Sequence, residues 1–486
     1  MRVLKKIAFH GTRAFRILAL GLGYFIHSPI KFINSLEVIS TQHFKIKNNY
    51  MKNPAQIASL KSTTEAIVIP QPPPKNLPSV VPLNLAIDET KNSKPYLNVL
   101  IPGMRIENMS GGPNTAINFA CRMGYLGVPI RFISTCGKAA EDHDPLFTHF
   151  ESLTGKKQPR GNIEIICGSD RSKPIYIGAN DKFLATAWWT AQMVMDAMPM
   201  MRNKKFIYFI QDFEPGLYPW GTEYALAMET YSMNIHPIFN TSILASHFIS
   251  NKLISFDANS SDFKKHVFEP TFDSEKFRYD PDPDRKLKRL LFYARPNIAR
   301  RNLFEIGIEA LNRVCAKEGF QGNWELLFIG DKIDPIRLAD GKVIKNAPWL
   351  KFDDYAKLLR NTDIVVSLML SPHPSYLPFE AASCGALTIT NSYGVKTAEI
   401  LQNISNNIIV TKPTIAGVEE GLIKALRIHN DSEYRKKGCE IKYPRNWDTS
   451  FADVLPAAME FWYDQSYTKS KIIRTEYQSK RIESTT

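Results

Sequence analysis

The amino-acid sequence predicts an α/β protein of two successive doubly wound domains, in which helices cover both faces of a parallel sheet. Three observations predict this fold class. The chain has 486 residues, too many for one ordinary hydrophobic core, so two or three domains are expected. Short, continuous apolar segments alternate with helical segments, which is typical of strands buried on both faces. The alternation occurs twice, before and after a polar, proline-containing segment at 279–284.

The first domain is expected at residues 96–280. Its strands are expected where short apolar runs occur, at 97–102, 130–134, 163–167, 206–210 and 236–239. A helix is expected at 113–126, where Pro113 suits the first helical turn because no backbone donor is needed there. Helices between such strands indicate a parallel sheet.

The second domain is expected at residues 281–448, where the alternation begins again. Its strands are expected at 290–294, 326–330, 364–370 and 387–390, and its helices at 303–315, 355–360 and 378–384. Open α/β sheets bind ligands beyond the carboxyl ends of their strands. The loops that follow these strands are therefore the candidate binding regions.

Residues 1–61 are expected to form a basic helical extension. In the first fifty residues, eight lysines and arginines accompany a single acidic residue, Glu37. An apolar run at 17–26 has about half the length of a membrane-spanning helix. Two interpretations stay open, either an interfacial helix on an anionic membrane surface or a helix packed on the protein itself.

Two further segments flank the domains. Residues 62–95 are rich in proline and predict a stiff, extended linker without helical or strand periodicity, so that regular structure is expected to start at Tyr96. Residues 449–486 are expected to form a C-terminal helix at 450–462 and a basic tail.

The composition restricts the function classes. The net charge of +13 suits anionic partners such as nucleic acid, anionic lipid or phosphorylated small molecules. No helix-turn-helix or RNA-recognition pattern occurs, so nucleic acid is not an expected partner. The six cysteines form no CxxC pair and have no zinc-ligand spacing, which favours reduced thiols in the cytoplasm.

A glycine pair follows the first expected strand. Gly111 and Gly112 allow the backbone to approach a ligand closely, and the next helix begins with free amide groups. The pair predicts a loop that closes over a diphosphate or a sugar. An ordinary turn between strand and helix is the alternative.

Three arginines follow the first strand of the second domain. Arg295, Arg300 and Arg301 are placed where a diphosphate would bind an open sheet. Guanidinium groups bind phosphate oxygens in pairs and can neutralise a departing nucleoside diphosphate. The alternative is a solvated loop.

Polar residues also follow the expected strand at 364–370. His373, Ser375, Tyr376 and Leu377 precede or open a helix that contains Glu380. A carboxylate in a mostly apolar helix needs partners, and ribose hydroxyls are suitable donors. This segment is a second candidate for binding a nucleotide.

The order and spacing of these motifs resemble the family 4 glycosyltransferases of the GT-B fold. More closely, the chain resembles the WsaF-like rhamnosyltransferases. The points of similarity are 208–220, 292–296 and 368–376, and the likeness spans roughly residues 96–462. The resemblance implies two Rossmann-like domains that face a cleft, and a nucleotide diphosphate sugar as donor.

The resemblance also implies roles for individual residues. The donor-binding residues would be Gly111, Gly112, Arg295, Arg300, Arg301, His373, Ser375, Tyr376, Leu377 and Glu380. Arg295, Arg301 and Gln211 would act in catalysis, and Asp212 and Glu214 would contact the acceptor. The first Glu of the family's paired pattern is replaced by Pro372, which suits a donor held differently, such as a deoxy sugar.

The resemblance implies L-rhamnose transfer from dTDP-β-L-rhamnose, with retention, to a cell-surface polysaccharide such as O-antigen or to a lipid-linked glycan. The enzyme would be cytoplasmic and peripheral at the inner face of the plasma membrane. No metal or other cofactor is expected, because the Asp-x-Asp at 280–282 lies in the interdomain connection and not after an apolar strand. The alternative is a non-catalytic GT-B protein that binds a nucleotide sugar or an anionic glycan.

Overall fold

The structure is a computed structural model. It describes residues 80–109, 111–254, 262–271, 273–282, 284–296, 300–317, 319–347 and 350–463. The expected basic N-terminal extension, most of the expected proline-rich linker and the basic tail lie outside these residues. Within the described residues, no helix combines the length and the apolar character that a membrane crossing requires.

The first domain contains a seven-stranded parallel sheet with the strand order β4–β3–β2–β6–β7–β8–β9. The strands are β2 (Leu97–Ile101), β3 (Ile130–Ser134), β4 (Ile163–Cys167), β6 (Lys182–Ala185), β7 (Phe206–Ile210), β8 (Ile235–Asn240) and β9 (Val267–Phe268). Side chains of a strand alternate between the two faces. Val99 therefore packs in the core on one face and Leu100 in the core on the other.

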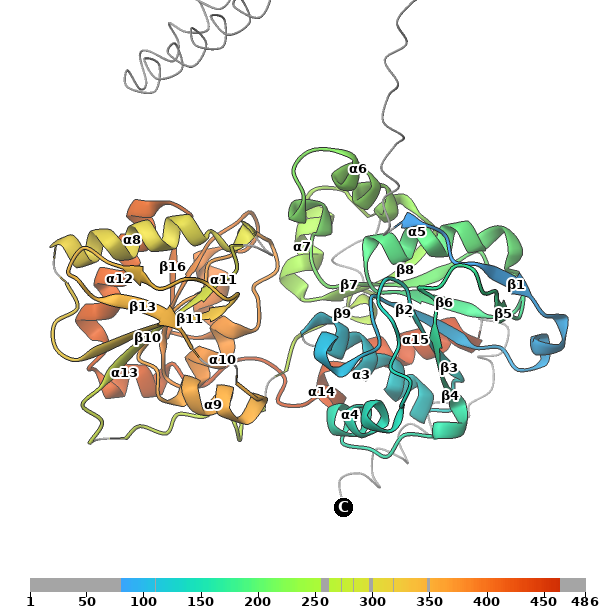
Figure 1. Cartoon of the computed structure of the whole chain (residues 1–486), viewed down its shortest axis with the longest axis horizontal. Coiled ribbons are helices and arrows are strands. Elements are labelled where there is room, and N and C mark those ends of the chain that lie inside the picture. The colour runs from blue at the N-terminus through green and yellow to red at the C-terminus, as the bar shows by residue number, and fades with distance from the viewer. Residues whose placement is uncertain are drawn as a thin grey trace, which may run out of the picture. The chain divides into compact units, whose positions relative to one another are not determined.

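Helices cover both faces of this sheet (Figure 1). α3 (Gly112–Tyr125) and α4 (Asp144–Thr154) contribute to one core, whereas α5 (Trp188–Ala197) and α7 (Ser242–Ser250) contribute to the other. The helix α6 (Thr222–Glu229) lies between β7 and β8 in sequence. The double coverage explains why apolar side chains predominate on both faces of these strands.

The second domain has the same architecture. Its seven-stranded sheet has the order β12–β13–β11–β10–β14–β15–β16, and the pair β12–β13 is antiparallel. The strands are β10 (Lys288–Ala294), β11 (Trp324–Gly330), β12 (Ile336–Arg337), β13 (Val343–Asn346), β14 (Ile364–Val366), β15 (Leu387–Asn391) and β16 (Ile408–Thr411). The predicted fold class, with two doubly wound α/β domains, is thus confirmed.

Two helix pairs form the cores of the second domain. α8 (Phe304–Lys317) and α12 (Ile415–Ile428) pack on one face of the sheet, and α9 (Phe352–Arg360) and α10 (Leu377–Ser383) pack on the other. Two further helices, α11 (Ala398–Ile404) and α13 (Ser432–Lys437), precede and follow α12. The helix α12 packs against α8 and against the strands β15 and β16.

Four described strands of the first domain, β1, β5, β6 and β9, were not expected from the sequence, and each has four residues or fewer. β1 (Leu85–Ile87) lies within the expected linker and pairs in parallel with β5 (Ile175–Ile177). The prediction that regular structure begins at Tyr96 is therefore wrong. The strand β6 lies in the middle of the sheet, between β2 and β7, but it has only four residues and begins with a lysine. Strands this short have too few residues to show a sequence periodicity. They are recognised only by their pairing with neighbouring strands.

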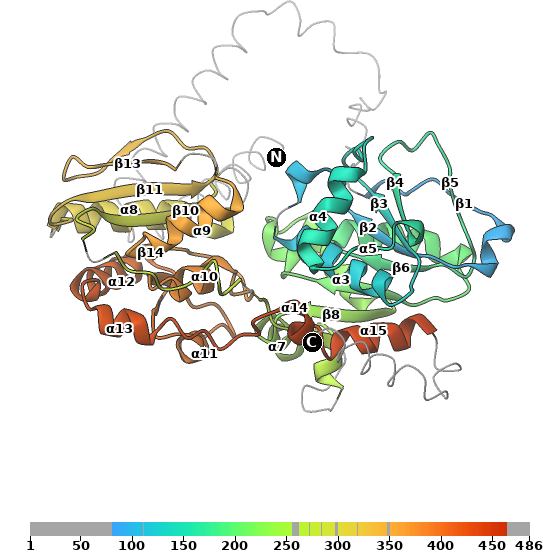
Figure 2. The ribbon, with the colours of Figure 1, turned by 90° about the horizontal axis from the view of Figure 1, so that it is seen from below.

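The C-terminal segment returns to the first domain. It forms α14 (Trp447–Ser450) and α15 (Val454–Tyr463), where one helix at 450–462 was expected. Val454, Leu455 and Ala458 are buried in the same core as Phe119. Figure 2 shows α15 along the first domain, beside β8. The last helix is thus part of the first domain's core and not a separate segment.

Lys182 holds the end of α15. Its Nζ donates to the carbonyl oxygens of Phe461 (2.7 Å) and Trp462 (2.9 Å). The last carbonyl groups of a helix lack partners within the helix and carry the negative end of its dipole. The strand β6, from which Lys182 projects, is thereby joined to the C-terminal helix.

Replacing Lys182 with methionine is expected to lower the free energy of unfolding by about 2 kcal/mol, because two charge-assisted hydrogen bonds to partly buried carbonyl groups are lost. Urea unfolding followed by circular dichroism measures this change. Lys173→Met is the control, since Lys173 is exposed and its contact with Asp170 is 3.9 Å long. Equal stability of the two variants would contradict the prediction.

Candidate functional site

A cavity of about 920 Å³ lies at the carboxyl ends of strands from both domains. In the first domain its walls follow β2, β7 and β8, and in the second they follow β10, β11, β13 and β14. This is the position at which open α/β sheets bind ligands. Of the predicted site residues, the lining includes Gly111, Gly112, Gln211, Asp212, Arg295, Arg301, His373, Ser375, Tyr376, Leu377 and Glu380.

The glycine pair begins α3. Gly111 has φ +49° and ψ −115°, a conformation that side-chain-bearing residues rarely adopt. A Cβ on Gly112 would lie 3.2 Å from the Gln211 side chain, and the Gln211 Nε2 donates to the Gly112 carbonyl oxygen at 2.9 Å. The glycines thus allow β7 and the first turn of α3 to meet at the cavity. The first-turn amides of a helix suit an anionic ligand.

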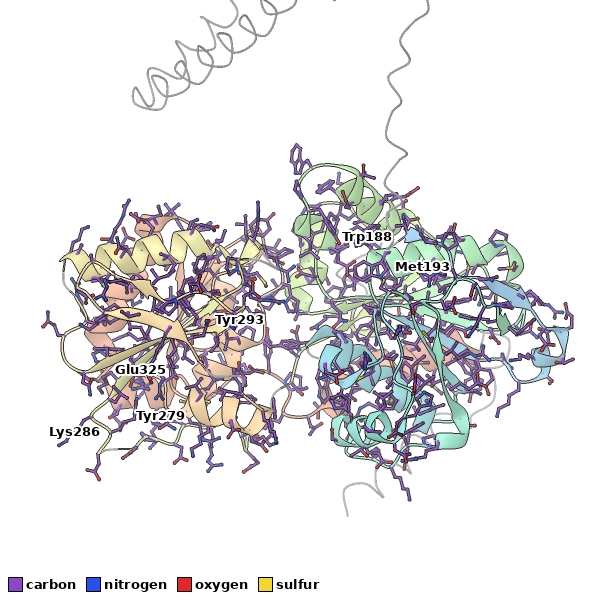
Figure 3. All side chains as sticks on the ribbon, in the orientation of Figure 1. Trp188, Met193, Tyr279, Lys286, Tyr293 and Glu325 are labelled. Atoms are coloured by element: carbon purple, nitrogen blue, oxygen red, sulfur yellow. The ribbon has the colours of Figure 1, made fainter. Side chains whose placement is uncertain are left out.

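Arg295 provides positive charge at the second domain's side of the cavity. Its side chain is about one-third exposed, and its Nε lies 3.7 Å from the Oδ1 of Asp331. It is also close to Tyr293, whose hydroxyl is 3.4 Å away and which is labelled in Figure 3. Gly330 has φ +124°, and a Cβ there would lie 2.4 Å from the Ala294 carbonyl oxygen. Glycine at this position therefore allows the ends of β10 and β11 to approach.

Arg301 is paired with Asp212 of the first domain. The Arg301 Nη2 lies 2.9 Å from the Asp212 Oδ2, and the Ser371 hydroxyl donates to Oδ1 at 2.5 Å. The Phe213 amide also donates to Oδ1, at 2.8 Å. Burial favours a higher pKa for Asp212, but Arg301, His373 and these hydrogen bonds together lower that pKa below its ordinary value. Asp212 is therefore ionised and joins the two domains.

His373 is buried, and one of its two ring nitrogens has a hydrogen-bond partner. Its Nδ1 accepts a hydrogen bond from the Ser375 amide at 3.0 Å, and its own amide donates to the Ser371 hydroxyl. Burial lowers the pKa of His373 to about 4, so the ring is neutral at pH 7. Since Nδ1 is an acceptor, the proton of the neutral ring lies on Nε2. Ser375 has φ +68°, a strained conformation that this turn imposes.

Tyr376 reaches across to the first domain. Its hydroxyl oxygen accepts from the Asn240 Nδ2 at 2.5 Å and lies 3.4 Å from the Thr115 Oγ1. Burial raises the pKa of Tyr376 to about 12, so the hydroxyl keeps its proton. The second-domain loop that carries His373 and Tyr376 is therefore anchored to the ends of β8 and α3.

Glu380 lies in α10 and lines the cavity. The Tyr355 hydroxyl donates to its Oε2 at 2.8 Å. Burial raises the pKa of Glu380 to about 7, although the hydrogen bond from Tyr355 opposes this shift. A carboxylate with one oxygen partnered in a cavity is ready to accept further hydrogen bonds, such as those of ribose hydroxyls.

Models of a known family match both domains. The WsaF N-terminal domain matches residues 96–242 and the WsaF C-terminal domain matches residues 288–423. The chain belongs to the WsaF family. It is 32% identical over 241 residues, or 49% of the chain, to the O-antigen biosynthesis protein RfbC of Myxococcus xanthus, and the match spans 18% of that relative's length. The fold of the two domains is GT-B.

Solved structures with similar folds are distant in sequence. The chain is similar to sucrose-phosphate synthase of Thermosynechococcus elongatus, with 10% identity and a TM-score of 0.48 over 77% of this chain and all of that one. It is also similar to Anabaena HepE in complex with UDP-glucose, with 12% identity and a TM-score of 0.48 over 76% of this chain and all of that one. It is similar as well to WaaG, a glycosyltransferase of lipopolysaccharide biosynthesis, with 11% identity and a TM-score of 0.45 over 75% of this chain and 99% of that one.

Two predicted site residues do not line the cavity. Arg300 is exposed, which leaves Arg301 as the arginine of this pair at the site. The Glu214 carboxylate accepts from the Trp188 amide at 2.5 Å and from the Tyr208 hydroxyl at 3.5 Å. Burial raises the pKa of Glu214 to about 8. The expectation that Glu214 faces the acceptor is therefore corrected, because its carboxylate is turned into the first domain.

Sequence reasoning missed several residues of the cavity. Asn240 ends β8 and Tyr355 lies in α9, and neither belongs to a recognisable motif. The rule that ligands bind beyond strand ends would have found Asn240, which is the last residue of an apolar strand. Lys396 is fully buried behind the site, where its Nζ donates to the Met369 carbonyl oxygen at 2.8 Å. Burial lowers the pKa of Lys396 to about 7.

The ion pair between Arg301 and Asp212 is expected to contribute to the stability of the protein. Arg301→Met is expected to lower the free energy of unfolding by about 2 kcal/mol, because Asp212 then keeps a buried charge without its cation. Adding Asp212→Asn is expected to restore part of the loss. Urea unfolding of the two single variants and the double variant measures the coupling. The exposed pair Arg313–Glu309 is the control, with a coupling of about 0.4 kcal/mol. A coupling no larger at Asp212 would contradict the prediction.

Proposed function

We propose that the chain is a glycosyltransferase that moves a sugar from a nucleotide diphosphate to a growing glycan. The main support for the proposal is one observation. A single cavity contains a cationic side chain, a carboxylate that can accept hydrogen bonds from ribose hydroxyls, and a glycine loop. Arg295 and Glu380 come from the second domain, and Gly111 and Gly112 from the first. Membership of the WsaF family and the likeness to an O-antigen biosynthesis protein support the same proposal.

The nucleotide would bind the second domain and the acceptor the first. Glu380 would accept hydrogen bonds from the ribose, and Arg295 would pair with the diphosphate. As the bond to the sugar breaks, negative charge accumulates on the leaving diphosphate, and Arg295 and the amides of α3 would stabilise it. No metal ion is needed for this step in the proposal. The cavity walls from both domains would keep water from the donor.

For the donor we propose dTDP-β-L-rhamnose, with retention at the anomeric carbon. The acceptor would be a lipid-linked glycan or a cell-surface polysaccharide of the O-antigen type. The enzyme would work in the cytoplasm, peripherally at the inner face of the plasma membrane. These statements rest on the resemblance to WsaF-like rhamnosyltransferases. A uridine donor is the first alternative.

Thermal stabilisation by a set of ligands tests the proposal. A ligand that binds the native state raises the melting temperature by mass action. dTDP and dTDP-L-rhamnose are expected to stabilise the protein more than the UDP, UDP-glucose, GDP and GDP-mannose compounds do. Incubation of the stabilising donor with glycan acceptors, followed by mass spectrometry, then tests for transfer.

The outcomes separate the alternatives. Stabilisation by UDP or GDP compounds instead would overturn the rhamnose donor and leave the transferase intact. Binding without transfer to any glycan would favour a non-catalytic protein that binds a nucleotide sugar. If no nucleotide shifts the melting temperature, the nucleotide site itself is wrong.

A further inference from the structure

Four polar side-chain atoms in the cavity wall are buried without a hydrogen-bond partner among the described residues. They are Gln211 Oε1, Asn240 Oδ1, Arg301 Nε and His373 Nε2. Buried polar groups are normally paired, because an unpaired group keeps its full desolvation penalty. A cluster of unpaired groups on one cavity therefore indicates a ligand that pairs with them.

The two amides are held so that their oxygens are the free atoms. The Asn240 Nδ2 donates to the Tyr376 hydroxyl at 2.5 Å, and the Gln211 Nε2 donates to the Gly112 carbonyl oxygen at 2.9 Å. Asn240 is 2% exposed and ends β8, so the strand fixes its backbone. The amide oxygens are thus preorganised acceptors, with no need to reorient when a ligand binds.

The set of free atoms identifies the chemical class of the ligand group. Two atoms accept hydrogen bonds, whereas Arg301 Nε and the protonated His373 Nε2 donate them. A diphosphate oxygen at pH 7 can only accept, so the amide oxygens of Gln211 and Asn240 would repel it. A sugar hydroxyl both donates and accepts, and a ring with several hydroxyls can satisfy the whole set.

We propose that Asn240 is a specificity-determining residue that accepts a hydrogen bond from a hydroxyl of the transferred sugar. Gln211 and His373 bind neighbouring hydroxyls of the same ring, and Tyr376 positions the Asn240 amide. This subsite is separate from the Arg295 side of the cavity, which takes the diphosphate. The inference rests on the proposed function, because it assumes that the cavity holds a nucleotide sugar.

The expected effect is a difference between two ligands. A site built to pair with a hydroxyl discriminates strongly against a ligand that lacks it, since its own buried group is then left unpaired. Removing the Asn240 acceptor should therefore weaken binding of the nucleotide sugar and leave binding of the nucleoside diphosphate nearly unchanged. A purely structural role of Asn240 would weaken both by the same factor.

Calorimetry with dTDP and dTDP-L-rhamnose measures this difference. Asn240→Ala is expected to raise the Kd for dTDP-L-rhamnose about tenfold or more and to change the Kd for dTDP less than threefold. Asn346→Ala is the matched control. Asn346 lines the same cavity, but its Nδ2 donates to the Ile333 carbonyl oxygen and its Oδ1 accepts from the Ile333 amide. Its substitution should leave the ratio of the two Kd values unchanged.

Two further measurements, on Asn240→Asp and on the unaltered protein with a deoxy donor, do not depend on the folding of the alanine variant. Asn240→Asp keeps an acceptor oxygen and is expected to keep the Kd ratio within about threefold of the wild type. With the unaltered protein, removal of one particular hydroxyl from the donor sugar should weaken binding about tenfold, and Asn240→Ala should not weaken binding of that deoxy donor further.

The outcomes separate this inference from the proposed function. If the wild type binds no nucleoside diphosphate, the proposed function fails first. If UDP or GDP compounds bind instead, the same ratios are measured with UDP-glucose or GDP-mannose. If a nucleoside diphosphate and its sugar both bind, but Asn240→Ala changes their Kd values equally or not at all, the sugar subsite at Asn240 is overturned.

Discussion

Replacing Arg295 with alanine is expected to raise the Kd for a nucleoside diphosphate about 100-fold, equivalent to nearly 3 kcal/mol. The reason is that Arg295 supplies a guanidinium at the cavity and that its one acidic contact among the described residues is a long one, with its Nε 3.7 Å from the Asp331 Oδ1. By contrast, Arg301 is already committed to Asp212. The Kd for dTDP, measured by calorimetry, tests this expectation.

The control for this prediction is Arg300→Ala. Arg300 neighbours Arg301 in sequence but is exposed and does not line the cavity. Its removal should change the Kd less than twofold, and both variants should keep the melting temperature of the wild type. Arg295→Lys is expected to recover only part of the affinity, because an ammonium lacks the planar pair of donors. Equal effects of Arg295→Ala and Arg300→Ala would show that long-range charge, and not a defined contact, governs binding.

Glu380→Gln is expected to have opposite effects on stability and on nucleotide binding. Burial raises the pKa of Glu380 to about 7, which means that the ligand-free protein favours the protonated form. The ionised carboxylate therefore destabilises the folded protein at pH 8. Glutamine removes that charge and can still accept the hydrogen bond from Tyr355. At pH 8 the variant should be more stable than the wild type by about 2 kcal/mol, after allowance for partial exposure.

The sign of the pH dependence follows from proton binding. Between the ordinary pKa of a glutamate and the raised value of about 7, the folded wild type binds more protons at Glu380 than the unfolded chain does. This group's contribution to stability therefore falls as the pH rises through that window, and is fully lost above it. The advantage of Glu380→Gln should be absent near pH 4.5 and complete near pH 8. Urea unfolding at pH 5 and pH 8 measures the difference.

The same variant should bind nucleotides more weakly. A charged acceptor makes stronger hydrogen bonds to ribose hydroxyls than a neutral one, so the Kd for a nucleoside diphosphate should rise about tenfold at pH 8. Glu309→Gln, on an exposed part of α8, is the control. It should leave the Kd unchanged and lower the free energy of unfolding by no more than about 0.4 kcal/mol, through its exposed pair with Arg313. A Glu380→Gln variant that is both less stable and weaker in binding would indicate a structural role for Glu380 instead.

The motif residues could be predicted because their residue type and the adjacent sequence are enough to recognise them. Arg295 and Glu380 stand out as charges next to apolar segments, and Gly111 stands out because glycine pairs mark close backbone approach. Position after a strand then implied a common cavity, since the carboxyl ends of parallel strands meet at one edge. The error at Glu214 has the same origin. It also follows a strand, but a turn directs its carboxylate toward the Trp188 amide.

The two doubly wound domains and most of the residues that meet at their strand ends could be predicted from the sequence, because apolar strands and helix starts are local patterns. The contacts of those residues became known only from the folded structure. Asn240 meets Tyr376 across 136 residues of chain, and Asp212 meets Ser371 across 159. The return of α15 to the first domain is of the same kind. Such contacts depend on how separately formed parts of the chain pack together. The sequence pattern within either segment does not determine that packing.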